Sequence, residues 1–236
     1  MKKLFIIANW KSNKTINEAE EWLEEISNIK YQISHIEYKE IILCPSFTLL
    51  PNLKSYIVNH KLPFKLGAQN VSKFREGAYT GEVTAQMISG LVKYCIVGHS
   101  ERRKYFNEND DDVIEKIKLL LEYKIMPILC ISDLSQLDSY VNRGRQIIGR
   151  SEEILFVYEP PDAISGGGEY KPDSPEDSNL YAGKIKERIG EIKILYGGSV
   201  NSDNVASFFS QPNIEGALVG QASLDPREFV EIIKNA

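Results

Sequence analysis

Short apolar runs recur along the whole chain and are separated by longer stretches of mixed polarity. The runs are continuous in hydrophobicity instead of alternating, which is typical of strands that are buried on both faces of a parallel sheet. Eight strands are predicted in this way: Leu4–Ala8, Ile41–Cys44, Phe64–Ala68, Tyr94–Gly98, Pro127–Cys130, Leu155–Tyr158, Ile192–Tyr196 and Ala217–Gly220.

The stretches between these runs have the pattern of helices. The predicted helices are Ile16–Ile33, Thr48–Val58, Thr84–Leu91, Asp111–Tyr123, Leu134–Ile148, Glu176–Ile189, Ser202–Phe209 and Pro226–Lys234. Asp225 before Pro226 is a typical helix start, and Ser202 or Asp203 can open another helix. The strict alternation of strands and helices indicates repeated βαβ units.

Eight such units fit a closed barrel better than an open, doubly wound sheet. An open sheet usually has fewer strands and a glycine-rich nucleotide loop after the first one, whereas Asn9, Trp10 and Lys11 follow the first strand here. We therefore predict an α/β protein, a single-domain (β/α)8 TIM barrel that comprises residues 1–236.

Composition and charge exclude several classes of function. The net charge of −5, with no basic cluster larger than Arg102–Lys104, argues against a nucleic-acid partner. The apolar run Leu4–Ala8 is too short for a signal peptide, and no stretch approaches the ~20 apolar residues of a membrane span. Cys44, Cys95 and Cys130 lie in apolar runs without metal-ligand spacing, so we expect buried, reduced thiols and no metal site. A cytoplasmic protein without a membrane partner is expected.

Polar residues with chemical potential follow several of the predicted strands. Asn9 and Lys11 follow the first strand, His99 the fourth and Glu159 the sixth, while the loops after the last two strands are rich in Gly and Ser. In a barrel of this kind the carboxyl ends of the strands surround one mouth. The sequence therefore predicts a site for a small anionic molecule that carries a carbonyl group.

Each of these residues also has an ordinary structural interpretation. A lone histidine is more often structural, but His99 comes directly before a polar stretch that can open a short helix, whose N-terminus favours a neutral imidazole. Glu159 is either a solvated carboxylate or a general base at the end of a buried strand. Lys11 is either a surface lysine or a positive charge that faces the mouth on the same side as Asn9.

The stretch from Pro160 to Pro175 is rich in Pro, Gly, Asp and Ser. Such a composition is typical of a linker between domains, but both flanks belong to the same alternation of strands and helices, so we interpret it as a mobile lid. Ser165 and the three glycines after it can bring backbone N–H groups close to phosphate oxygens. The acidic run Asp110–Asp112 is interpreted as a solvated helix start without a function.

Several longer strings match one family. They are Ala8–Asn13, Gly67–Val71, Gly77–Glu82, Ile96–Arg103, Tyr158–Pro160 and Tyr196–Ser199. On these strings, which occur in the expected order, the sequence resembles triosephosphate isomerase along essentially its whole length. The resemblance implies a cofactor-free isomerase of glycolysis and gluconeogenesis that interconverts dihydroxyacetone phosphate and D-glyceraldehyde 3-phosphate through an enediolate.

The resemblance also implies a role for individual residues. Glu159 would be the base, His99 the neutral electrophile, and Lys11 and Asn9 the groups that stabilise the enediolate. The remaining residues fall into three groups: Ser165, Ser199, Gly220 and Gln221 would bind the phosphate, Ser100 and Glu101 would support the catalytic groups from behind, and Thr80 would reach into the partner subunit of a homodimer.

The sequence departs from the family pattern at the lid, where Pro161, Asp162 and Ser165 replace the usual residues, and at Gln221, where the family usually has a second glycine. These differences keep two alternatives open. One is an isomerase of another phosphorylated sugar, such as a tetrose phosphate, and the other is a non-catalytic phosphosugar-binding homologue. The presence of Asn9, Lys11, His99 and Glu159 together argues against the second alternative.

Overall fold

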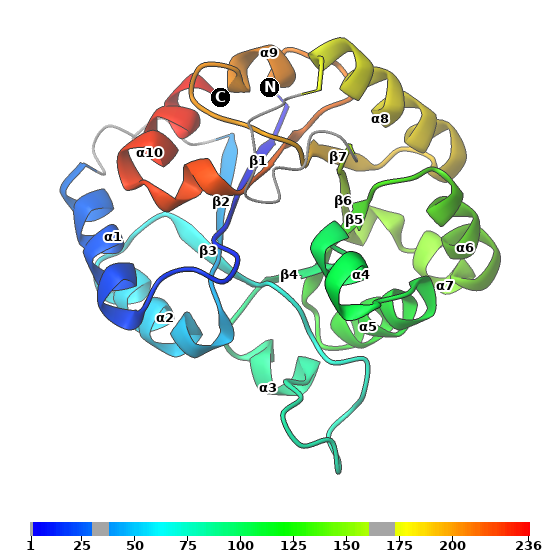
Figure 1. Ribbon diagram of the computed structural model, residues 1–236, viewed down its shortest axis with the longest axis horizontal. Coiled ribbons are helices and arrows are strands. Elements are labelled where there is room, and N and C mark those ends of the chain that lie inside the picture. Colours follow the sequence, from blue (N-terminus) through cyan, green and yellow to red (C-terminus); the bar gives the residue numbers. More distant parts are fainter. Residues whose placement is uncertain (1, 30–37, 161–172) are drawn as a thin grey trace.

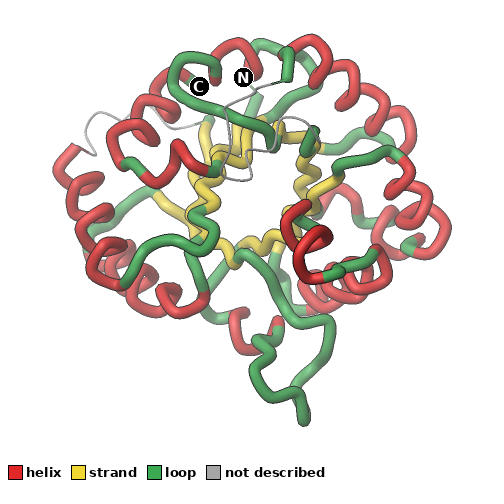
Figure 2. Tube along the Cα trace, viewed as in Figure 1, coloured by secondary structure: helices red, strands yellow, loops and turns green. Residues whose placement is uncertain are grey.

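The computed structural model describes residues 2–29, 38–160 and 173–236. Eight parallel strands form a closed barrel in which each strand pairs with its neighbours in the sequence and β8 pairs with β1. The ring of strands is visible at the centre of Figure 2. The strands are β1 Leu4–Asn9, β2 Lys39–Cys44, β3 Phe64–Ala68, β4 Tyr94–Val97, β5 Met126–Ile131, β6 Leu155–Tyr158, β7 Lys193–Tyr196 and β8 Gly216–Val219. The predicted barrel is therefore confirmed.

Helices surround the barrel on the outside (Figure 1). They are α1 Ile16–Ile29, α2 Leu50–Asn59, α3 Ala85–Ser89, α4 Ser100–Phe106, α5 Asp110–Glu122, α6 Ser135–Arg143, α7 Arg145–Ile148, α8 Pro175–Ile189, α9 Val205–Phe209 and α10 Pro226–Asn235. Short 3₁₀ turns occur at Phe47–Leu49, Ser151–Glu153 and Gln221–Leu224.

Two of the predicted helices are interrupted or shortened in the structure. The helix predicted over 134–148 is divided at Gly144, where an added Cβ atom would lie 2.7 Å from the carbonyl oxygen of Tyr140. The helix predicted from Ser202 begins only at Val205, because the side chain of Asn201 accepts the backbone N–H groups of Asp203 and Asn204 in a turn. Such side-chain turns compete with helix formation. The helix predicted over 48–58 begins with a 3₁₀ turn, and residues 30–33 of the helix predicted over 16–33 lie outside the described residues.

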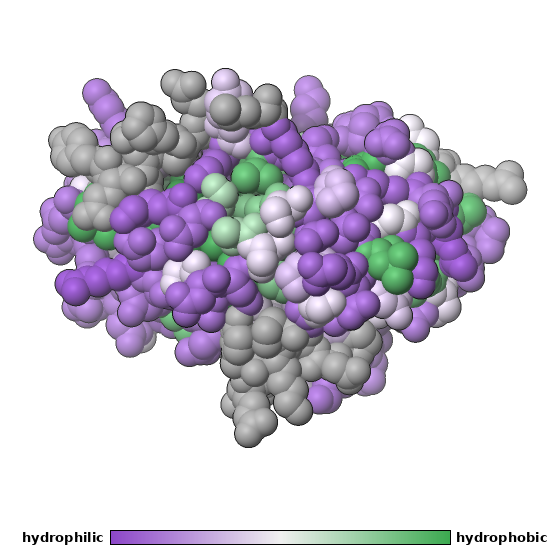
Figure 3. Space-filling view, turned by 90° about the horizontal axis from the view of Figure 1, so that it is seen from above, coloured by the Kyte–Doolittle hydropathy of each residue, from purple (hydrophilic) through white to green (hydrophobic). Residues whose placement is uncertain are grey.

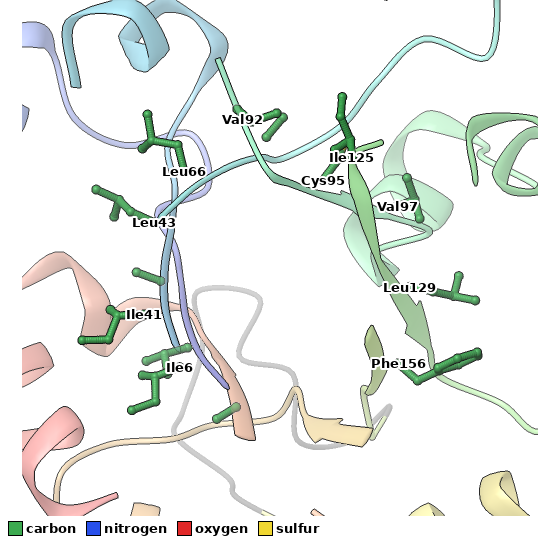
Figure 4. Packing of buried hydrophobic residues seen from close by; sticks show 14 of the residues in the cluster. Ile6, Ile41, Leu43, Leu66, Val92, Cys95, Val97, Ile125, Leu129 and Phe156 are labelled. Carbon is green, nitrogen blue, oxygen red and sulfur yellow. The ribbon is translucent and has the colours of Figure 1, made fainter. Parts of the chain in front are cut away.

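The core has two layers, one inside the barrel and one between the barrel and the helices. Along β1, Phe5 and Ile7 belong to the inner layer, whereas Ile6 and Ala8 belong to the outer one. Figure 4 shows the outer layer, in which side chains such as Ile6 and Phe156 point away from the barrel axis. Because successive strand residues face opposite sides and both sides are buried, the strands read as continuous apolar runs.

The three cysteines are buried and form no disulfide, as predicted. Burial raises the pKa of each thiol. On the outside, the face with α8 and α9 is mainly hydrophilic, with small hydrophobic patches (Figure 3). None of the described helices is long and apolar enough to cross a membrane.

The interpretation of Asp110–Asp112 as merely solvated is wrong for two of its members. The carboxylate of Asp110 accepts from Arg103 at 2.8 Å, and that of Asp112 accepts from Lys73 at 2.6 Å. Both side chains are less than one-fifth exposed. The acidic start of α5 therefore joins this helix to α4 and to the loop after β3, besides complementing the helix dipole.

Candidate active site

A cavity of about 180 Å³ lies at the carboxyl ends of the strands. The structure brings together there seven of the residues that the sequence singles out, namely Asn9, Lys11, His99, Glu159, Ser199, Gly220 and Gln221. They come from five different strand ends or the loops that follow them. Predicted and observed positions agree because the closed barrel directs all these loops to one mouth.

Glu159 directly follows β6 and is fully buried. Its Oε2 atom accepts the backbone N–H of Ser100 at 2.9 Å. Its Oε1 atom lies 3.1 Å from Nε2 of His99 and receives no hydrogen bond from a described residue. One carboxylate oxygen is thus held in place, and the other lies beside the imidazole without a hydrogen bond from a described residue, so it can act as a general base.

His99 caps the N-terminus of α4, and its Nδ1 atom accepts the backbone N–H of Glu101 at 3.2 Å. A nitrogen that accepts a hydrogen bond carries no proton, so the ring is assigned as the neutral tautomer with its proton on Nε2. The same helix start binds Glu159 through Ser100. Helix α4 therefore orients both the imidazole and the carboxylate.

Asn9 ends β1 and lies next to His99, with 3.5 Å between Nδ2 of Asn9 and Nε2 of His99. Its Oδ1 atom accepts the backbone N–H of Lys11 at 3.1 Å. With this assignment the amide nitrogen of Asn9 and the imidazole N–H are two donors side by side. Together they can bind an oxygen atom of a substrate.

Lys11 reaches the cavity for a different reason from the predicted one. It lies beyond the end of β1, and its φ angle of 51° is in the left-handed region, so a turn and not the strand pleat directs its side chain. Its ammonium group pairs with Glu101 at 2.6 Å. Gln69 supports the turn by donating to the carbonyl oxygens of Lys11 and Cys44 at 2.9 and 2.8 Å.

Small residues after β7 and β8 form the opposite wall of the cavity. At Gly198 an added Cβ atom would lie 2.2 Å from the hydroxyl of Tyr196, so no side chain fits without rearrangement. Gly220 precedes a 3₁₀ turn, and its carbonyl oxygen accepts the Ser223 hydroxyl at 2.7 Å. The backbone therefore borders the cavity at this wall, where its N–H groups can approach a phosphate closely. The longer side chain of Gln221 lines the same wall.

Ser165 and the rest of the segment 161–172 lie outside the described residues, so the predicted lid is not tested. Directly after this segment, the backbone N–H of Asp173 donates to the hydroxyl of Tyr196 at 3.0 Å. The ring of Tyr196 stacks on Phe208 with 4.0 Å between centroids. Tyr196 therefore fixes the chain where it returns to α8.

The sequence did not predict the supporting contacts of Gln69 and Tyr196. It also did not predict those of Glu108, whose carboxylate accepts from Gly98, Arg102 and Lys116. Gln69 and Tyr196 lie in strings that carry the family resemblance, so their position was a usable signal. Glu108 is in a connection between two helices and has the sequence pattern of a surface residue, yet its side chain is only 3% exposed. Its partners come from separate elements and could not be paired from the sequence.

The arrangement combines a buried carboxylate, two hydrogen-bond donors and an ammonium group around one cavity. Such a set can remove a proton next to a carbonyl group and stabilise the oxyanion that forms. Among residues 2–29, 38–160 and 173–236, no group of three His, Cys, Asp or Glu side chains is placed to hold a metal ion.

Comparison with known proteins gives a consistent result. The family model described as triosephosphate isomerase matches residues 4–236. Proteins named triosephosphate isomerase from Dictyoglomus turgidum and Thermus thermophilus are each 38% identical to this chain, over the full length of both proteins. A protein of the same name from Thermodesulfovibrio yellowstonii is 37% identical over 99% of this chain and its own full length. The chain therefore belongs to the triosephosphate isomerase family.

Proposed function

We propose that this chain interconverts dihydroxyacetone phosphate and D-glyceraldehyde 3-phosphate, with Glu159 as the base and His99 as the electrophile. The observation that carries the proposal is the approach of Glu159 Oε1 to within 3.1 Å of His99 Nε2 in a cavity that Lys11 also lines. The sequence match over the whole chain supports the same substrate pair.

In this mechanism Glu159 removes a proton from the carbon next to the substrate carbonyl, and the electron pair of that C–H bond forms the enediolate. The imidazole N–H of His99 and the amide of Asn9 donate to the oxygen that becomes negative. Lys11 supplies the positive charge that balances the enediolate and the phosphate. The proton of the hydroxyl group on the deprotonated carbon passes to the negative oxygen through His99, which gives its Nε2 proton to one oxygen and takes a proton from the other. Protonated Glu159 then gives its proton to the former carbonyl carbon, so no cofactor is consumed.

The mechanism is tested by isomerisation in deuterium oxide. We expect the product to carry deuterium at the carbon that receives the proton, because the proton on Glu159 exchanges with solvent in a fraction of turnovers. Product without deuterium after complete conversion would indicate direct hydride transfer between the two carbons. An inactive protein would contradict the proposed function itself.

We further propose that Ser199, Gly220 and Gln221 bind the phosphate and that Ser165 contributes from the lid. The first three residues line the wall at which the backbone borders the cavity. This wall is close to Lys11, because a Cβ atom added at Gly220 would lie 3.5 Å from Cε of Lys11. The full 236 residues are proposed to act as one catalytic domain. The buried, unpaired cysteines favour a reducing compartment, so we propose that the enzyme works in the cytoplasm.

The replacement Gly197→Ala is expected to lower activity by displacing Glu159. A Cβ atom at position 197 would lie 2.5 Å from Val157 Cγ1 and 2.9 Å from Glu159 Cγ. Such overpacking typically costs ~1–3 kcal/mol of stability, and a base that is misplaced by ~1 Å can cost up to ~10²-fold in rate. Steady-state kinetics and urea unfolding measure the two effects. The matched control is Gly90→Ala, where an added Cβ meets nothing within 4 Å; equal kinetics of the two variants would contradict this account of Glu159.

We propose that the protein is a homodimer, and two features support this proposal: a second cavity and a projecting loop. The cavity, of about 210 Å³, adjoins the first one and is lined by Lys11, His99 and Phe106 among others. The loop of residues 69–84 extends away from the barrel (Figures 1 and 2). Its ends are joined by the Ser72 N–H, which donates to Val83 O at 2.8 Å, and Thr80 near its tip is exposed. We propose that Thr80 of each chain enters this cavity of the other.

Replacing residues 77–80 by a short polar turn is therefore expected to give monomers with reduced activity, since Lys11 and Asn9 would lose a supporting contact. Light scattering measures the mass, and a coupled assay measures the activity. An unmodified protein that is monomeric at micromolar concentration would contradict the proposed dimer.

A further inference from the structure

Gly98, the residue before His99, is held by charged side chains at both its backbone N–H and its carbonyl oxygen. The N–H of Gly98 donates to Oε1 of Glu108 at 2.9 Å, and its carbonyl oxygen accepts from Nε of Arg103, also at 2.9 Å. Gly98 has a φ angle of +70°, and an added Cβ would lie 3.1 Å from Arg103 Nη2 and 3.3 Å from the carbonyl oxygen of Cys130. The turn between β4 and His99 is therefore specified by glycine and fixed by two side chains.

Glu108 makes this contact from within a buried ionic group. Its Oε2 atom accepts from Nε of Arg102 at 2.7 Å and also from the ammonium group of Lys116. Burial raises the pKa of the Glu108 carboxyl, but the charges of Lys116 and Arg102 and their hydrogen bonds outweigh burial, so the pKa lies below its ordinary value. Glu108 is thus ionised, and its bond to the Gly98 N–H is charge-assisted and strong.

The same group extends to the loop that we propose at the dimer interface. Lys116 on α5 also donates to Oδ1 of Asn70 at 2.8 Å, at the beginning of the 69–84 loop. Glu108 itself lines neither the substrate cavity nor the second cavity. Its most direct connection to the chemistry runs through Gly98, one residue before His99, and a second one runs through Arg102 on α4.

We propose that Glu108 is a positioning residue for His99: its carboxylate fixes the Gly98 turn and thereby aims Nε2 of His99 at the substrate oxygen. The consequence for activity rests on the proposed function. Beyond Val97 the β4 ladder ends, so without Glu108 the buried N–H of Gly98 would lose its partner and the turn would relax. Small displacements of a catalytic group are costly, up to ~10²-fold in rate for ~1 Å.

The test is the variant Glu108→Gln, which keeps the size of the side chain and removes its charge. The amide has one accepting oxygen and an NH2 group that cannot accept, so the bonds from Gly98, Arg102 and Lys116 cannot all be kept. We expect kcat to fall by about 10- to 100-fold, whereas KM stays within about threefold because the phosphate wall after β7 and β8 does not contact residue 108. The matched control is Glu115→Gln on α5, the helix that begins two residues after Glu108, where the carboxylate is 54% exposed and pairs only with Lys118 among described residues. This control is expected to retain wild-type kinetics.

The nitrogen NMR signals of the imidazole rings distinguish a role of Glu108 in positioning His99 from a role in stability alone. The chain has only three histidines, and His99→Gln identifies the signals of His99. We expect these signals to shift in Glu108→Gln and to remain unchanged in Glu115→Gln. Wild-type His99 signals in folded Glu108→Gln, or a kcat within about threefold of wild type, would overturn the proposal.

If Glu108→Gln does not fold, Lys116→Met provides the same test, because it keeps the carboxylate and removes its buried cation. A smaller fall in kcat and a shift of the His99 signals are expected, and unshifted signals would overturn the proposal. If the wild-type protein has no isomerase activity, the proposed function fails, but the His99 signals of the variants still decide whether Glu108 positions this ring.

Discussion

Glu159→Gln is expected to abolish isomerisation almost completely while the protein remains folded. General-base catalysis typically contributes ~10²–10⁴-fold, which corresponds to ~2.7–5.5 kcal/mol of transition-state free energy. The glutamine amide keeps the shape of the side chain, and its oxygen can still accept the Ser100 N–H that holds Glu159 Oε2. It cannot take up a proton. We therefore expect a loss in kcat and little change in the affinity for inorganic phosphate.

The matched control for this variant is Glu153→Gln, which removes a carboxylate in the 3₁₀ turn just before β6. That side chain is 44% exposed and pairs with Arg150 on the surface, so kinetics are expected to stay at the wild-type level. Circular dichroism and phosphate titration verify folding and binding of both variants. A Glu159→Gln enzyme that keeps more than about a tenth of the wild-type kcat, a loss of ~1.4 kcal/mol or less, would show that the base is another residue.

Lys11→Met is expected to cause the second-largest loss, about 10²–10³-fold in kcat, the range typical of removing one group that stabilises an oxyanion. The ammonium group lines the cavity and is held 2.6 Å from Glu101. Methionine keeps much of the length and removes the charge. Because both the phosphate and the enediolate lose their counter-charge, KM should rise and kcat should fall in steady-state assays.

Lys14→Met is a closely matched control for this change. Lys14 lies in the same loop, also has a positive φ angle (69°), and directs its ammonium group to the carbonyl oxygen of Leu224 at 3.0 Å, outside the cavity lining. Both variants place methionine in a left-handed conformation and remove one positive charge. Equal losses in the two variants would mean that net charge or backbone strain, and not the position of Lys11, determines activity.

The barrel could be predicted from the sequence because its strands are buried on both faces. Runs such as Leu155–Tyr158 carry no polar interruption, and the alternation with helices then leaves few topologies. His99 and Glu159 could be found for a related reason, since each directly follows such a run. Residues at the carboxyl ends of all the barrel strands surround the same mouth.

What could not be predicted depends on backbone turns and on partners from distant elements. The sequence predicted correctly that Lys11 reaches the mouth of the barrel, but it attributed this position to the alternation of side chains along the strand. In the structure a left-handed turn that Gln69 supports directs the side chain. The pairing of Asp112 with Lys73 joins residues 39 positions apart, which no local pattern contains. Glu108 is the clearest case, because its three partners lie on β4's end, α4 and α5. Gly144, by contrast, was a visible helix-breaking signal.

The decisive measurement is kcat/KM of the purified protein for D-glyceraldehyde 3-phosphate and for a tetrose phosphate under identical conditions. We expect efficient turnover of the triose phosphate, with kcat/KM in the range of ~10⁴–10⁸ M⁻¹s⁻¹ typical of enzymes, and a much lower value for the longer sugar. A preference for the tetrose phosphate would contradict the assigned substrate, and binding of both without turnover would contradict the assignment of Glu159, His99 and Lys11 as a catalytic set.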